Sequence, residues 1–239
     1  MTNLLDRAVE AHGGLGHFNQ FQTVSAYLMM GGALWGLKGQ AGVFNQVGVT
    51  VDLHQEHVSF APFKLPNRQT DFTPDRVAIE TKEGVAVEER THPRAAFAGH
   101  TSQTPWDELH ALYFGSYAMW TYLTIPFSLT WAGFEAREID PWQEQGESWR
   151  RLEVTFPPSV ASHSTKQTFY IGDDGLLRRH DYNVEVVGNA PLAHYPSEYK
   201  DISGFPIWTK RRAFIRKPDN MPAPEQLMIA IDLSDIRFT

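Results

Sequence analysis

The residues best suited to chemistry alternate along one predicted strand, Leu176 to Val187. Successive side chains of a strand point to opposite faces, so this segment divides into two sets. One set contains Leu176, Arg178, His180, Tyr182, Val184 and Val186, and the other contains Leu177, Arg179, Asp181, Asn183, Glu185 and Val187. We interpret the first set as the core side, because it carries the valines at 184 and 186. This predicts that Arg178, His180 and Tyr182 point inward, and that Arg179, Asp181 and Glu185 face solvent.

Three inward polar groups of these types can bind or transform a small molecule. Arg178 can hold an anion or carboxylate, His180 can move a proton as a general base, and Tyr182 can donate a hydrogen bond. The alternative is structural: these side chains satisfy one another or nearby buried backbone, with His180 a tethered core histidine.

A second group of candidates lies on and just before a predicted helix. His110, Tyr113, Tyr117 and Trp120 follow one another at three- and four-residue steps, which places them on one helical face. This stripe can line a ligand cavity and meet His180, or it can serve ordinary helix-to-sheet packing. His100 and Trp106 lie in the preceding loop, a position typical of a lid.

Metal and cofactor chemistry has little support. His163 and His194 lie near proline-containing loops and can approach His180 to form a three-histidine metal site, but surface positions are the alternative. His54 and His57, three apart in a predicted strand, point to opposite faces. The chain has no cysteine, and it shows no Gly-x-Ser-x-Gly, P-loop or dinucleotide motif. We therefore expect neither a metal nor a cofactor.

The helix that carries the aromatic stripe interrupts a sequence of strands. Thr104 or Asp107 can cap it, and Pro126 should end or kink it. Apolar side chains cover nearly its whole circumference, so the helix from about Asp107 to Ile125 should be buried on more than one side. A shorter amphipathic helix should begin at Asn3 and stop at His12-Gly13-Gly14.

The remaining segments predict β-strands. Period-two patterns cover Thr23 to about Phe60, Arg76 to Thr81, Val85 to Thr91, Phe134 to Ile139, Ser148 to Phe156, Thr165 to Ile171, Leu176 to Val187, Phe205 to Arg216 and Gln226 to Phe238. Turns at 82–84 and 172–175 predict hairpins between neighbouring strands. Without repeats or a convincing linker, the sequence predicts one α+β domain over residues 1–239, an antiparallel sheet wrapped around a central apolar helix.

Composition and charge narrow the function. Seven Trp, eight Tyr and 15 Phe make an aromatic-rich chain, and aromatic rings are common in the walls of small-molecule pockets. The formal charge of -7 argues against nucleic-acid binding. Charges within the first seven residues do not fit a signal peptide, and no run of 18 apolar residues appears. We expect a cytoplasmic protein with no transmembrane segment.

Two segments resemble a known superfamily. The run Thr168 to Arg179 contains a strand, an Asp-Gly turn, leucines and basic residues, and it is followed by Gly204-Phe205-Pro206-Ile207-Trp208-Thr209-Lys210-Arg211-Arg212. This order is similar to the lipoprotein-carrier (LolA-like) superfamily. The resemblance implies a curved half-barrel closed by helices around a lipid-sized cavity. Tyr113 to Tyr122 and Arg178 to Tyr182 look like a set of bacterial cytoplasmic proteins of no known activity, so this second likeness implies no function.

Two functions of different classes follow. The first is a cytoplasmic binding protein for a hydrophobic small molecule or acyl chain, whose polar end meets Arg178 or His180. The alternative is a cofactor-independent isomerase, lyase or hydrolase of a hydrophobic metabolite. His180 would then act as general base, Tyr182 and Tyr113 as donors to an oxyanion, and Arg178 as an electrostatic clamp. Exposed edge strands and tryptophans leave a partner-binding role open, including a homodimer.

Overall fold

A computed structural model describes residues 3–239. Its α-helices are α1 (Leu4–Ala11), α2 (Leu15–Phe18), α3 (Ala33–Leu37) and α4 (Glu108–Thr124), and its 3₁₀ helices are η1 (Pro93–Phe97), η2 (Phe127–Thr130) and η3 (Glu185–Val187). The first six strands are β1 (Thr23–Gly31), β2 (Asn45–Asp52), β3 (Val58–Ala61), β4 (Arg68–Thr73), β5 (Arg76–Thr81) and β6 (Ala86–Thr91). The later strands are β7 (Glu135–Glu144), β8 (Glu147–Thr155), β9 (Lys166–Ile171), β10 (Leu177–Val184), β11 (Ala190–Ile202), β12 (Phe205–Arg216) and β13 (Pro222–Phe238).

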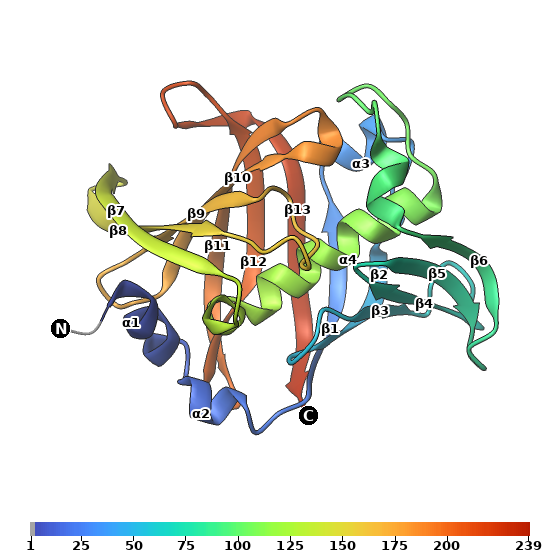
Figure 1. The fold of residues 1–239 in the computed structure, drawn as a ribbon, viewed down its shortest axis with the longest axis horizontal. Coiled ribbons are helices and arrows are strands. Elements are labelled where there is room, and N and C mark those ends of the chain that lie inside the picture. The colour runs from blue at the N-terminus through green and yellow to red at the C-terminus, as the bar shows by residue number, and fades with distance from the viewer. Residues whose placement is uncertain (1–2) are drawn as a thin grey trace.

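Within residues 3–239, the strands form one 13-stranded antiparallel sheet in the order β6-β5-β4-β3-β2-β1-β13-β12-β11-β10-β9-β8-β7. Two meanders, β1 to β6 and β7 to β13, are joined where β1 pairs with β13. The sheet curves strongly, so that β6 and β7 form the two free edges of a half-barrel (Figure 1).

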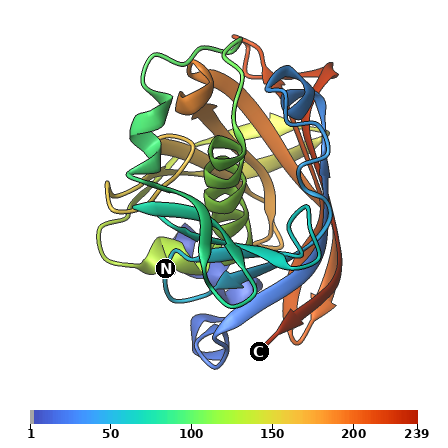
Figure 2. The same cartoon turned by 90° about the vertical axis from the view of Figure 1, so that its right-hand side faces the viewer.

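Helix α4 connects these two edges and lies along the concave face of the sheet, which wraps around it (Figure 2). Asp107 caps its first turn by accepting a hydrogen bond from the His110 backbone, and Ile125 before Pro126 ends it. From Leu109 onward the helix is buried except at His110, which confirms the prediction of a central apolar helix.

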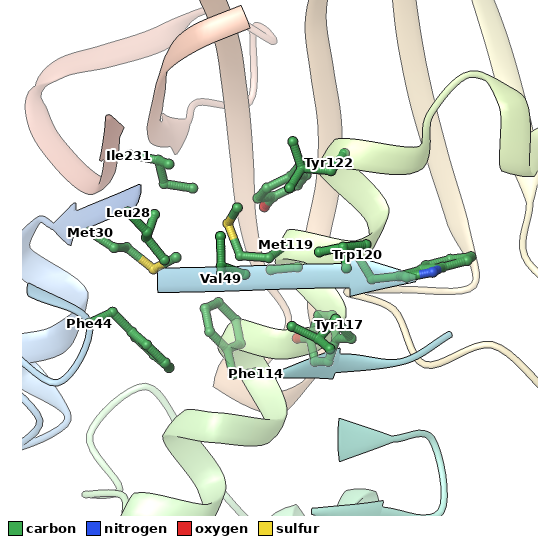
Figure 3. Packing of buried hydrophobic residues seen from close by; sticks show 14 of the residues in the cluster. Leu28, Met30, Phe44, Val49, Phe114, Tyr117, Met119, Trp120, Tyr122 and Ile231 are labelled. Carbon is green, nitrogen blue, oxygen red and sulfur yellow. The ribbon is translucent and has the colours of Figure 1, made fainter. Parts of the chain in front are cut away.

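The core lies between α4 and the inward rows of the strands. Figure 3 shows Phe114 and Met119 of the helix facing Leu28, Val49 and Ile231 of three adjacent strands. The inward positions of β1 alternate as the sequence predicts, since Val24, Ala26, Leu28 and Met30 are all buried. Helices α1 and α2 lie beside the opposite end of α4 from α3 (Figure 1).

Most predicted elements are confirmed, including the α1 helix with its Asn3 cap, the β5–β6 hairpin and the tight turn at 172–175. The sequence prediction lacks the helices α2 and α3, the strands β4 and β11, and the three 3₁₀ helices. The α3 helix lies within Thr23 to Phe60, a segment for which the sequence predicts strands. Strand β11 contains Pro191 and Pro196, which lack the amide donor that a central strand normally uses.

In the described part of the chain, no helix combines the length and the apolar character needed to span a membrane.

Candidate functional site

A groove of about 510 Å³ opens at the mouth of the half-barrel, and we call it the mouth groove. Its walls come from the β4–β5 turn, from η1 and from the β8–β9 loop, which contributes Phe156 through Ser162 and Thr165. Tyr113 of α4 also lines it. Proline, alanine, valine and aromatic side chains supply the apolar part of the surface. The polar part comes from Asp75, His92, Arg94, Ser159, Ser162, Thr165 and Glu185.

Arg94 ties the two sides of the mouth groove together. Its Nη1 donates to the carbonyl of Ser162 at 2.8 Å, and its Nη2 pairs with the carboxylate of Glu185. Burial raises the pKa of Tyr113, and the nearby Arg94 guanidinium opposes that rise. The arginine and tyrosine groups therefore lie in a groove whose lining is about equally polar and apolar.

A second link joins the same two sides beneath the surface. Glu56, in the loop between β2 and β3, accepts a hydrogen bond from the backbone amide of Ala161 at 2.8 Å. Its other carboxyl oxygen is buried without a hydrogen-bond partner among the described residues. Burial raises the pKa of Glu56 well above its usual value, which favours the neutral acid.

A buried polar network lies deeper, between the second half of α4 and strands β10 to β12. The hydroxyl of Tyr122 is 2.7 Å from Nε2 of His163 and 2.8 Å from the hydroxyl of Tyr182. The Tyr182 hydroxyl is 3.0 Å from Nδ1 of His194, and Nε of Arg211 donates to Nε2 of His194 at 3.4 Å. All five side chains are buried.

Arg211 fixes the direction of this chain of hydrogen bonds. A guanidinium only donates, so Nε2 of His194 must accept and Nδ1 must carry the proton that it donates to Tyr182. Tyr182 then donates to Tyr122, and Tyr122 donates to Nε2 of His163. The chain ends at Nδ1–H of His163, which has no hydrogen-bond partner among residues 3–239.

The histidines of this region are neutral. Burial lowers the pKa of His163, His180 and His194 well below the usual value, and the charge of Arg211 lowers each of them further. The sequence left open whether these three residues converge, with surface positions as the alternative for two of them. The surface interpretation is wrong: all three are buried around the Tyr122–Tyr182 pair.

Tyrosine hydroxyls, rather than a shared ligand position, connect the imidazoles of His163 and His194. In the part of the chain that the structure describes, no group of three or more His, Cys, Asp or Glu side chains is arranged to hold a metal ion.

His180 and Tyr182 point inward, as the alternation predicts, but His180 has no access to the mouth groove. Its Nε2 bonds to Oε1 of Gln167 at 2.7 Å, and its ring stacks on Phe169 with centroids 4.2 Å apart. The side-chain amide of Gln167 donates to Ser164, so the oxygen faces His180, which must carry its proton on Nε2. The free Nδ1 is buried without a partner among the described residues.

The predicted inward position of Arg178 is wrong. The pairing of β10 with β9 shifts between Leu177 and Arg179, a β-bulge that breaks the alternation. Arg178 is consequently at the surface, where it pairs with Asp174 at 2.7 Å and lies 3.6 Å from Glu147. It cannot meet a ligand of the core.

The predicted solvent positions of Arg179 and Asp181 are also wrong, although Glu185 is exposed as expected. Arg179 forms 2.7 Å contacts with both Asp181 and Glu144, and the rings of Tyr170 and Tyr195 lie near its guanidinium. Glu144 ends the edge strand β7, so this strand helps to cover the outer face of β10. Two covered faces make alternation a poor guide to exposure here.

The residues of the predicted aromatic stripe on α4 lie in different surroundings and make different contacts. Tyr113 reaches the mouth groove, whereas the Tyr117 hydroxyl is buried with no partner among residues 3–239. Trp120 donates to the carbonyls of Asp52 and Gln55, at 3.2 and 2.9 Å.

His110 uses Nδ1 to cap the helix and places Nε2 3.3 Å from the Ala96 carbonyl. His100 and Trp106 lie in the loop before α4, and neither lines the mouth groove. The ammonium of Lys38 donates to the carbonyls of Thr101, Ser102 and Thr104, which anchors this loop.

Sequence reasoning missed Glu56, Arg94 and Arg211. A signal for Arg211 was present, because Phe205, Ile207, Thr209, Arg211 and Ala213 form one alternating row in a strongly patterned strand, and all five are buried. Arg94 and Glu56 lie in connecting segments, where no periodicity indicates direction.

Comparison with solved structures identifies the architecture. A DUF1329 family protein from Desulfovibrio piger superposes with a TM-score of 0.57 at 12% identity, covering 99% of this chain and 94% of that protein. A LolA superfamily protein from Nitrosomonas europaea superposes with a TM-score of 0.54 at 10% identity, covering 99% of this chain and 92% of that protein. The fold is LolA-like. A domain from Vibrio parahaemolyticus that is assigned to outer membrane lipoprotein sorting superposes with a TM-score of 0.52 at 10% identity. The superposition covers 96% of this chain and 93% of that domain.

These superpositions confirm the expected LolA-like half-barrel. No protein-family model matches the sequence, and no curated protein matches it. At 10 to 12% identity, the likeness concerns the fold alone.

Proposed function

We propose that the protein binds a hydrophobic small molecule or acyl chain, and that the mouth groove holds it. The observation that carries this proposal is the groove itself. Its volume of about 510 Å³ is in the range of small-molecule sites, and its walls combine apolar side chains with polar groups that can orient a ligand. The LolA-like fold and the lipoprotein-sorting role of one structural neighbour are consistent with an apolar ligand.

The arrangement around the groove suits a binding protein better than the enzyme alternative. A general base must come within hydrogen-bond reach of its substrate, directly or through one water. His180 is 0% exposed and lines neither the groove nor any other opening described here. The groups that do reach the groove, Tyr113 and Arg94, are suited to holding a polar end.

Filling the groove tests the proposal. Ala95 lines the groove and is exposed, whereas Ala98, three residues later, is exposed but lies outside it. We expect Ala95→Trp to weaken binding of the neutral apolar probe N-phenyl-1-naphthylamine by tenfold or more. The matched variant Ala98→Trp should bind as the wild type does, and equal binding by both variants would disprove the assignment of the groove.

Cytoplasmic location and a homodimer remain predictions. Cell fractionation tests the first, with the protein expected in the soluble cytoplasmic fraction. The free edge strand β6 is exposed along almost its whole length, which leaves a surface on which a second copy can pair. Sedimentation of the purified protein tests the second prediction.

A further inference from the structure

Arg211 lacks the partner that a buried arginine normally has. The residue is 1% exposed, in the middle of β12 on the concave face of the sheet. Within residues 3–239 its guanidinium forms no ion pair with a carboxylate, and its Nη2 has no hydrogen-bond partner. A buried charge without a counter-charge is strongly unfavourable, and arginine does not lose its proton in proteins.

The surroundings of Arg211 are neutral. Its guanidinium lies 4.1 Å from the ring of Tyr122 and 4.9 Å from that of Trp208. The hydrogen-bonding capacity of Tyr122 and Tyr182 is used within the network, and His194 offers only one lone pair. Ring faces attract the cation, but they do not supply the negative charge that its burial calls for.

An enclosed void of about 10 Å³ is lined by the same two rings, Tyr122 and Trp208, although Arg211 itself is not part of its lining. His12 and Phe18 of the α1–α2 segment also line it. Its remaining lining is almost entirely apolar, including Leu123, Phe127 and Ile207. None of its lining residues belongs to the mouth groove, so this is a separate place in the molecule.

We propose that Arg211 binds the carboxylate of an amphiphilic ligand whose apolar chain lies beneath the α1–α2 segment. The carboxylate supplies the missing counter-charge, with Nη2 as the free donor. The void as it stands holds about one water, so the chain of the ligand enters by displacing α1 and α2. Few polar contacts tie these helices to the sheet: Arg7 donates to the Asp173 carbonyl, and Nε2 of His17 lies 2.8 Å from the Ser203 carbonyl.

Binding of decanoate, decanol and acetate to the wild type tests the proposal first. Decanol has the same chain without a charge, and acetate has the charge without the chain. We expect decanoate to bind at least tenfold more tightly than decanol. Competition by acetate at concentrations similar to those of decanoate would identify a free small anion as the ligand, whereas weak competition would identify an amphiphile. Equal affinity for decanoate and decanol would overturn the proposal.

Variants then locate the site. Arg211→Met should remove the preference for decanoate over decanol. Arg212→Met should keep it, because Arg212 points the other way and pairs with Asp232 at 2.6 Å. Ala95→Trp, which fills the mouth groove, should also keep it, and this separates failure of the proposed function from failure of this site. Preference retained in Arg211→Met would overturn the assignment.

Should Arg211→Met not fold, a measurement on the wild type replaces it. With ¹³C-carboxyl-labelled decanoate bound to ¹⁵N-arginine-labelled protein, the carboxyl carbon should show a direct dipolar coupling to guanidinium nitrogens in solid-state NMR. Absence of that coupling in the bound complex would exclude contact with an arginine.

Discussion

Arg178 and Arg179 are adjacent in sequence, yet the first is a surface residue and the second is completely buried on the outer face of β10. The side chain of Arg178 is 26% exposed and that of Arg179 is 0% exposed. The bulge that separates Leu177 from Arg179 in the pairing with β9 produces this difference. Two neighbouring arginines therefore provide a matched pair for mutation.

Arg179→Met should cost about 3 to 5 kcal/mol of folding free energy, because it leaves the carboxylates of Asp181 and Glu144 buried without their cation. Arg178→Met should cost about 1 kcal/mol or less, since its ion pairs are partly exposed. Urea unfolding of both variants measures the difference. Equal losses would show that the Arg179 cluster contributes no more than a surface pair.

Trp120→Ala should reduce the free energy of unfolding by about 3 to 5 kcal/mol through the cavity that it leaves. The ring is fully buried, and its Nε1 also secures the β2–β3 loop through two carbonyls. Trp142→Ala, in the edge strand β7, serves as the comparison, and its half-buried ring should give a clearly smaller loss in chemical denaturation. A loss as large as that of Trp120→Ala would contradict the central role of α4 in the core.

Glu56→Gln should raise the melting temperature at pH 7. The folded-state pKa of Glu56 lies well above its usual value because of burial, so the folded protein retains a proton that the unfolded chain releases above about pH 4.5. Folding at neutral pH therefore carries a penalty that grows as the pH rises from about 4.5 to the folded pKa. Glutamine keeps the acceptor for the Ala161 amide and removes this penalty. Below pH 4.5 the gain should disappear, and a gain that is independent of pH would indicate another cause.

Stability should fall as the pH drops below about 6.5. His163, His180 and His194 have folded-state pKa values well below 6.5, whereas the unfolded chain binds protons near that pH. The unfolded state then carries more protons, so each such histidine lowers stability by up to about 1.4 kcal/mol per pH unit. The positive charge of Arg211 lowers the pKa of all three histidines, and the charge of Arg94 also lowers the pKa of His163.

Two substitutions with opposite effects check this assignment by thermal melting from pH 5 to 8. His180→Asn should make the decline below pH 6.5 shallower. His57→Asn should make it steeper, because the hydrogen bond to Asp71 raises the pKa of His57 and so stabilises the folded state at low pH. A decline unchanged by His180→Asn would assign the pH dependence to other groups.

The architecture follows from sequence patterns to a considerable extent, and the site follows less well. The all-round apolar character of residues 108–124 identifies the central helix, since no exposed helix has that composition. Period-two rows locate most strands, including β12 with the bounds that the structure has. The inward direction of His180 and Tyr182 follows from the same rule.

The rule fails at Arg178 because a bulge changes the phase of alternation and leaves no clear mark in the sequence. It fails at Arg179 and Asp181 because both faces of β10 are covered. The mouth groove depends on Arg94 and on loops brought together across the half-barrel, and contacts between distant loops have no periodicity to reveal them.

The pairing of β1 with β13 has a consequence for how the chain folds. Among the described residues, every other ladder joins strands that are consecutive in sequence, so each meander can form from local hairpins. Among the ladders of the described residues, only this one requires strands about 200 residues apart to meet, and loop-closure entropy opposes it until both halves exist. We therefore expect docking of two preformed half-sheets around α4 to be the slow step of folding. We also expect the sheet to separate first between β1 and β13 when the protein is partly unfolded.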